Sequence, residues 1–106
     1  MSFRYMRVLV MFDLPVTTAA GRKEYARFRK FLIKSGFMML QESIYSKLAT
    51  NDSAADSIIA SVRSHKPEDG LVQVLRITEK QFARMEVIVG EAANGVLDST
   101  ERVVFL

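Results

Sequence analysis

The segment Met6–Asp13, which reads MRVLVMFD, constrains the fold more strongly than any other part of the chain. Apolar side chains occupy both of its alternating faces, and Val8 and Val10 are β-branched. This pattern predicts a central strand that is covered on both faces. Leu14 and Pro15 end the strand, because proline cannot donate a hydrogen bond to the ladder. We therefore expect the fold to be built around this strand.

A helix is expected over residues 19–35, soon after the strand. Thr17 and Thr18 are its candidate N-cap residues, and Gly36 suits the left-handed position that ends a helix. Small or apolar side chains recur at helical spacing and form one stripe, which we expect to face the sheet. The stripe consists of Gly21, Tyr25, Phe28 and Leu32.

The rest of the chain alternates between extended and helical patterns. The run from Phe37 to Ala49 predicts two strands joined by a bend, or one long strand with a bulge. Asn51 or Ser53 caps a second helix that reaches about Ser64. The remaining expected elements are a strand over residues 71–77, a helical turn over 79–84, a fifth strand over 85–89 and, after a loop over 90–100, a terminal strand over 102–106.

This order of elements is the ferredoxin-like βαββαβ arrangement, so the predicted fold class is α+β with extra C-terminal strands. At 106 residues the chain is expected to form a single domain, residues 1–106, with its core in about residues 1–84. Residues 85–106 carry the fifth strand and an apolar tail, and we expect them to dock a second copy or a partner at a sheet edge. The expected assembly is a homodimer.

The composition excludes several classes of site. The chain has no cysteine and one histidine, His65, which excludes a disulfide framework, a thiolate zinc site and a multi-histidine metal site within one chain. The apolar run Val8–Phe12 is shorter than the roughly seven residues of a signal peptide or the roughly twenty of a membrane span. We therefore expect a soluble, cytoplasmic protein with no membrane partner.

The net charge of +3 is distributed unevenly. Residues 1–35 contain eight Lys and Arg against two acids, a balance of +6, and residues 36–106 contain seven bases against ten acids, a balance of −3. A row of bases on one helix face can follow a phosphate backbone without reading its sequence, although a solvated helix face has the same composition. The row on the expected first helix is Lys23, Arg27, Lys30 and Lys34, flanked by Arg22 and Arg29.

Asp13 is the first candidate for chemistry, because it places a carboxylate at the end of an otherwise apolar strand. The simpler interpretation is that it only begins the turn. One carboxylate binds Mg²⁺ weakly, so two copies of Asp13 facing each other across a twofold axis would make a better site. Gln41, Ser43 and Tyr45 lie in or beside a polar break in the second extended run. They either orient a water or a phosphate or satisfy backbone groups at a bulge.

Together these features resemble the CRISPR-associated protein 2 family, the small ferredoxin-like partner of the CRISPR integrase. The resemblance rests on Phe12-Asp13, on the basic first helix and on Gly36-Phe37 followed by QxSIY over residues 41–45. ITEKQF over residues 77–82 resembles the family's strand-exit segment, and the closing STERVVFL resembles members from type II systems.

The resemblance implies a homodimer in which Asp13 is the metal-binding and catalytic carboxylate, with Mg²⁺ or Mn²⁺ as cofactor and Gln41 and Ser43 as possible support. It implies a role in CRISPR adaptation (spacer acquisition), in which the dimer bridges dimers of the integrase, CRISPR-associated protein 1, and holds protospacer duplex DNA. The expected DNA contacts are Arg22, Lys23, Arg27, Lys30 and Lys34.

Two other functions are left open. One is a metal-dependent endonuclease that cuts single-stranded RNA or duplex DNA through paired Asp13 residues. The other is a small-molecule regulatory module, which the basic first helix and the lack of a glycine-rich loop disfavour.

Overall fold

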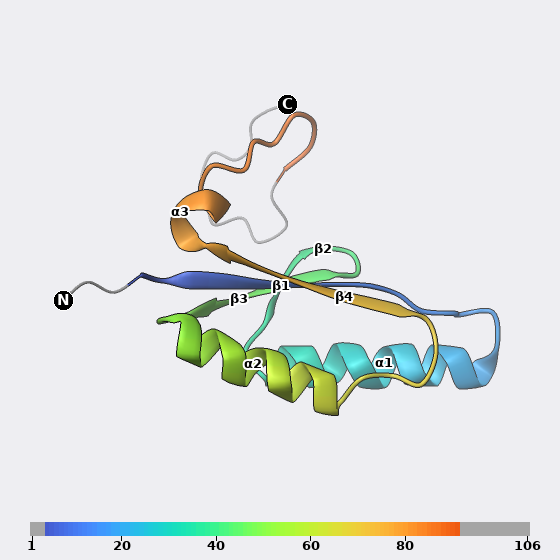
Figure 1. Cartoon of the computed structure of the whole chain (residues 1–106). Helices are drawn as coiled ribbons and strands as arrows, with labels where there is room; N and C mark the ends of the chain where they lie inside the picture. The colour runs from blue at the N-terminus through green and yellow to red at the C-terminus, as the bar shows by residue number, and fades with distance from the viewer. Residues whose placement is uncertain (1–3, 92–106) are drawn as a thin grey trace.

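A computed structural model of the chain describes residues 4–91 (Figure 1). This part of the chain forms a four-stranded antiparallel sheet and three helices. Its first six elements follow the predicted ferredoxin-like order, so the α+β fold class is confirmed. The elements are β1 (Met6–Asp13), α1 (Ala19–Lys34), β2 (Met38–Gln41), β3 (Ile44–Ala49), α2 (Asp52–Ser64), β4 (Leu71–Thr78) and α3 (Glu79–Phe82).

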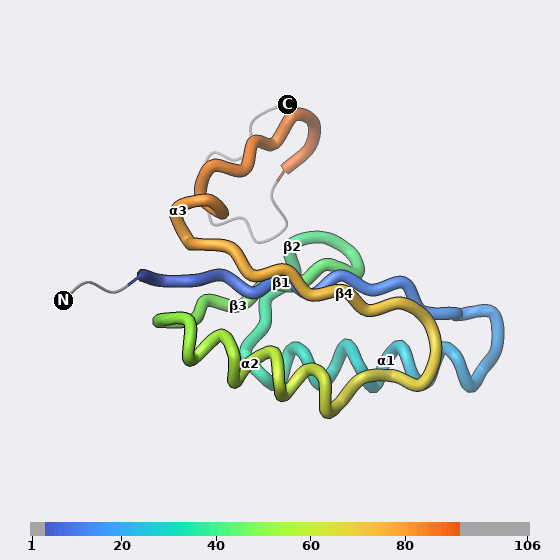
Figure 2. The backbone as a smooth tube through the Cα atoms, viewed as in Figure 1, coloured from blue at the N-terminus to red at the C-terminus, as the bar shows by residue number. Residues whose placement is uncertain are grey.

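β1 is a central strand of the sheet, as predicted. The strand order is β2-β3-β1-β4, and β1 pairs with β4 along its whole length and with β3 from Met6 to Met11. The second extended run forms two strands, and their register shifts between Met39 and Gln41. In Figure 2 the backbone passes from β3 through α2 and returns as β4 beside β1. The crossover places both ends of β1 next to segments that are distant in the sequence.

The two long helices cover the same face of the sheet (Figure 1). Phe12 of β1 is buried there with Phe28 and Leu32, two members of the predicted α1 stripe. Gly21 and Tyr25, the other two members, are partly exposed. Since strand side chains alternate between faces, the other residues of β1 lie on the opposite face, which we call the open face. They are Arg7, Leu9, Met11 and Asp13.

Of the predicted N-cap candidates, Thr18 caps α1 and Asn51 caps α2, whereas Thr17 and Ser53 do not cap these helices. The Thr18 hydroxyl accepts a hydrogen bond from the Gly21 amide at 2.9 Å, and the Asn51 side chain accepts one from the Ala54 amide at 2.8 Å. Gly36 follows α1 with φ of +96°, a backbone conformation that favours glycine. Among the helices of residues 4–91, none is long and apolar enough to cross a membrane.

The open face carries exposed apolar side chains from three strands. Met38 and Leu71 are each 54% exposed, Leu75 is 48% exposed and Leu48 is 45% exposed. The strand register places all four on the same side as Leu9. The two long helices therefore cover only one face of β1. The prediction that the strand is covered on both faces is not met by these helices.

α3 is anchored at one end of the open face by Arg7. The Arg7 guanidinium donates two hydrogen bonds to the Glu79 carboxylate, at 2.7 and 2.6 Å, and lies 4.4 Å from the centre of the Phe82 ring. The Glu79 amide donates to the Tyr5 carbonyl at 2.9 Å. A capping box between Thr78 and Gln81 begins the helix.

The predicted fifth strand over residues 85–89 is wrong. The chain is irregular there, and Met85, Val87, Ile88 and Val89 are all more than half exposed. The physical reason is that α3 turns the chain away from the sheet after β4, so that no neighbouring strand supplies a ladder partner. The predicted terminal strand over residues 102–106 lies outside the described residues.

Candidate functional site

Asp13 ends β1 on the open face, with its side chain exposed. It pairs with Leu71 across the β1–β4 ladder. Leu14, the next residue, turns inward and is buried, and Pro15 then leaves the sheet. The carboxylate therefore stands at the rim where the strand stops.

Two contacts fix this end of β1. Phe12 packs into an aromatic cluster, with its ring centre 5.2 Å from that of Phe28 and 5.8 Å from that of Tyr45. Gly70, with φ of +93°, also passes so close that a Cβ there would lie 2.7 Å from the Asp13 carbonyl oxygen. The backbone of Asp13 is thus held by core packing and by a glycine contact.

The β2–β3 hairpin brings further polar groups to Asp13. Its turn consists of Glu42 and Ser43, and Ser43 has φ of +66°. The Ser43 carbonyl accepts a hydrogen bond from the Phe12 amide at 3.0 Å, and the Ser43 hydroxyl lies 3.2 Å from the Tyr25 hydroxyl. These contacts tie the turn to the end of β1 and to α1.

Two shallow hollows adjoin this region and share Asp13, Glu42 and Ser43 in their walls. One opens on the open face, beside Leu71 and Gln73 of β4 and the strand residues Met11 and Ile44. The other lies beside the start of α1, where Leu14, Val16, Arg22 and Tyr25 complete its wall. We call the shared wall the Asp13 rim.

Of the three polar residues that the sequence singles out beside the break, only Ser43 lines the Asp13 rim. Ser43 lies beside Asp13, but Gln41 pairs with Ile44 in the hairpin and lines neither hollow. Tyr45 is 1% exposed and belongs to the core. Sequence reasoning missed Glu42, because its nearness to Asp13 depends on the hairpin folding back along β1. The one signal was its position within the polar break.

The donor set of the Asp13 rim fits a hard divalent cation. Asp13 and Glu42 offer carboxylates and Ser43 a hydroxyl, and oxygen ligands are what Mg²⁺ and Mn²⁺ prefer. Residues 4–91 contain no group of three or more His, Cys, Asp and Glu side chains that is suited to a metal. Mg²⁺ commonly uses only one or two protein carboxylates and keeps several waters, which this set allows.

The predicted basic row lies on the exposed side of α1, and its members differ in how their charges are engaged. Lys23, Lys30 and Lys34 are exposed, and no carboxylate of residues 4–91 forms an ion pair with them. Arg22 is also exposed and donates to the Val16 carbonyl at 3.2 Å, which leaves other guanidinium donors available. α1 has six bases against one acid. Its surface is therefore strongly cationic.

Arg27 differs from the rest of the row. Its guanidinium donates to the Glu24 carboxylate at 3.0 and 2.8 Å and to the His65 carbonyl at 3.2 Å. The hydrogen bond from Arg27 lowers the pKa of Glu24, and the same contact raises the pKa of Arg27. The charge of Arg27 is therefore engaged within the protein, which makes it a weaker candidate for a phosphate contact than its neighbours.

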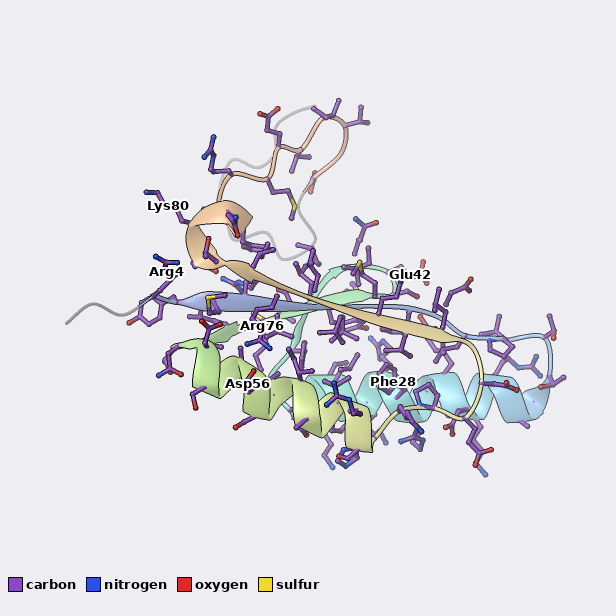
Figure 3. The ribbon with its side chains drawn as sticks, in the orientation of Figure 1. Arg4, Phe28, Glu42, Asp56, Arg76 and Lys80 are labelled. Atoms are coloured by element: carbon purple, nitrogen blue, oxygen red, sulfur yellow. The ribbon has the colours of Figure 1, made fainter. Side chains whose placement is uncertain are left out.

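Two other polar residues from the sequence have structural partners. Arg76 lies 3.3 Å from an Asp52 carboxylate oxygen and 2.8 Å from one of Asp56, both on α2, and these contacts raise its pKa. Figure 3 shows Arg76 and Asp56 side by side. His65 stacks on Phe31 with ring centres 4.1 Å apart and lines neither hollow of the Asp13 rim.

Comparison with known proteins identifies the family. Residues 6–85 match the family model described as CRISPR associated protein Cas2. The chain belongs to the Cas2 family. A protein of Treponema denticola described as CRISPR-associated endoribonuclease Cas2 is 54% identical over 95% of this chain and 100% of its own length. One of Streptococcus mutans with the same description is 48% identical over 95% of this chain and 93% of its own.

A solved structure described as "Crystal structure of cas2" shares the fold. It aligns with a TM-score of 0.60 and 20% identity over 91% of this chain and 99% of its own. At that identity the likeness concerns the fold alone. The predicted resemblance to this family is confirmed by the family model and the curated relatives.

Proposed function

We propose that this Cas2-family chain acts in the cytoplasm as a homodimeric adaptor of spacer acquisition, which binds duplex DNA and bridges dimers of the CRISPR integrase. The observation that carries this proposal is the exposed face of α1, where Lys23, Lys30 and Lys34 have no acidic partner within residues 4–91. Family membership supports a place in a CRISPR system.

The α1 face suits phosphates rather than bases. Its available side chains are long cations on one regular helix, so they can follow a charged backbone. The nearby aromatic rings of Tyr25 and Phe28 pack against Phe12 instead of standing exposed as stacking surfaces. Binding through this face is therefore expected to be independent of sequence and strongly dependent on salt.

The open face supports the homodimer part of the proposal. Four large apolar side chains are about half exposed on it, and the exposed segment 85–89 leaves α3 on the same side of the sheet. A second copy is the natural cover, because a closed twofold pair buries the same apolar surface on both protomers at once. The dimer would also supply a second Asp13.

The alternative function is metal-dependent cleavage of a phosphodiester at the Asp13 rim. Asp13 and Glu42 would hold Mg²⁺ or Mn²⁺, and Ser43 would help to orient a bound water or phosphate. A metal bound there would polarise a phosphate oxygen and lower the pKa of a bound water. Arg22, in the wall of the adjoining hollow, would neutralise phosphate charge. The relatives described as endoribonucleases favour this second candidate.

Spacer acquisition in cells separates the two functions. Asp13→Asn keeps the size of the side chain and removes its charge, whereas Lys23→Gln with Lys30→Gln removes two cations and preserves helix propensity. The adaptor proposal expects acquisition to continue with Asp13→Asn and to fall with the double variant. Loss of acquisition in Asp13→Asn, with duplex binding intact, would instead support the nuclease.

A further inference from the structure

A second group of exposed cations lies at the opposite end of β1 from Asp13. Arg4 precedes β1, and Lys80 and Arg84 belong to α3 and the turn that follows it; all three are exposed. Figure 3 shows Arg4 and Lys80 beside each other at this end of the sheet. A hollow there is lined by Arg4, Tyr5, Thr78, Glu79 and Lys80. We call Arg4, Lys80 and Arg84 the α3 patch.

The backbone sets these residues together from distant parts of the sequence. Met6 pairs with Thr78 in the β1–β4 ladder. The helical turn continues past α3, because the Ala83 amide donates to the Glu79 carbonyl at 2.9 Å. Arg84 follows on the same hydrogen-bonded turn as Lys80, because its amide donates to the Gln81 carbonyl at 3.1 Å. The patch is thus built on the sheet and on a hydrogen-bonded turn.

Glu79, the carboxylate in the wall of this hollow, does not form an ion pair with the α3 patch. Glu79 accepts both of its charge-assisted hydrogen bonds from Arg7. Within residues 4–91, no carboxylate forms an ion pair with a member of the patch. Segments 4–7 and 78–84 together hold four bases and one acid, a balance of +3 that equals the net charge of the whole chain.

We propose that the α3 patch is a second phosphate-binding surface for nucleic acid, separate from the row on α1. Its members are long, exposed cations, which suit a phosphate backbone read without regard to sequence. α1 lies on the other side of the sheet, so the phosphates held by the patch belong to a different stretch of nucleic acid from those along α1 (Figure 1). This inference rests on the nucleic-acid binding proposed above.

The test is the salt dependence of binding by the full chain to a labelled blunt DNA duplex. Arg4→Gln with Lys80→Gln should lower the slope of log affinity against log salt by about two, since each phosphate contact contributes about 0.9. Arg76→Gln removes a charge from β4 and should leave the slope unchanged, because Arg76 is already paired with acids of α2. Arg4→Lys with Lys80→Arg keeps both charges and should retain the wild-type slope.

The outcomes distinguish this inference from the proposed function. Wild-type binding that weakens with salt, together with an unchanged slope in the Gln variant of the patch, overturns the inference and leaves the proposed function standing. A slope that also falls in the charge-conserving variant overturns it as well, since the loss is then structural. Absence of duplex binding by the wild-type chain at low salt overturns both. A slope that falls only in the Gln variant of the patch supports the inference.

Discussion

At the scale of single residues, the Asp13 rim depends on a glycine that carries no chemistry. Gly70 has positive φ, and a Cβ there would lie 2.7 Å from the Asp13 carbonyl oxygen and 2.7 Å from Leu14 Cδ2. A side chain at this position must therefore displace the strand end that presents the carboxylate. The absence of a side chain at residue 70 therefore allows β1 to present the Asp13 carboxylate in this position.

Gly70→Ala should destabilise the fold by more than Gly90→Ala. Both positions have positive φ, which costs an alanine about 1–2 kcal/mol, but a Cβ at Gly90 meets no atom within 4 Å. The overlap at Gly70 should add about 1–3 kcal/mol, as overpacking does. Urea unfolding of the two variants measures the difference in the free energy of unfolding. Equal losses would show that the approach to Asp13 is not tight.

The Glu24 carboxylate provides a test by titration. Its pKa is lowered by the hydrogen bond from Arg27, so the folded state holds this proton less tightly than the unfolded state. The contact therefore contributes stability above the ordinary pKa of 4.5, and this contribution is lost as pH falls through the lower folded value. Carboxyl NMR should show Glu24 titrating below 4.5 in the wild-type chain and closer to 4.5 in Arg27→Gln. An unchanged midpoint in the variant would contradict the assigned cause.

At the scale of elements, Arg7 adds a side-chain anchor for α3 to the backbone hydrogen bond between the Glu79 amide and the Tyr5 carbonyl. Arg7 joins β1 to a helix that lies 72 residues later in the chain, and its guanidinium is bound on one side by Glu79 and on the other by the Phe82 ring. The side chains of Arg7 and Glu79 are 18% and 33% exposed, so solvent only partly screens the pair. α3 in turn sets the direction in which segment 85–89 leaves the sheet.

Arg7→Met should cost about 1–3 kcal/mol, because it leaves the Glu79 carboxylate partly buried without its donor. Arg76→Met is the matched control: its ion pairs involve exposed carboxylates on α2, and pairs of that kind contribute less than about 1 kcal/mol. Amide hydrogen exchange should show faster exchange at Ala83 in Arg7→Met only. Equal effects of the two variants would indicate that α3 is held by other contacts.

The elements also show how far the sequence alone could predict the structure. The first six elements could be predicted in the observed order because their signals are local. These signals are the helical and strand periodicity and the residues at helix ends, Thr18, Asn51 and Gly36. The prediction of a strand over residues 85–89 was wrong because an apolar pattern indicates a preference for burial. It does not indicate whether a neighbouring strand is present to pair with. Glu42 and the Arg7–Glu79 pair were missed because both depend on the topology of the sheet.

At the scale of the whole molecule, the open face carries large apolar side chains that a single copy leaves about half exposed. The assignment of residues 85–106 to docking stays a prediction, since residues 92–106 lie outside the described part. Light scattering should report about twice the chain mass of 12.0 kDa. Leu75→Asp places a charge on the open face and should shift the measured mass toward that of one chain. Ile33→Asp places the same charge at an exposed position of α1, away from the open face, and should not shift the mass. A wild-type monomer would contradict the proposed homodimer.

The central claim is that unpaired cations on α1 bind the phosphates of duplex DNA, and the salt dependence of binding tests it most directly. Lys23→Gln with Lys30→Gln removes two such cations, and Arg76→Gln removes one that is already held by α2. Removing two phosphate contacts should lower the slope of log affinity against log salt by about two, with no change for Arg76→Gln. A slope in the Lys23 and Lys30 double variant equal to that of the wild-type chain would contradict the claim and reduce the α1 row to a solvated helix face.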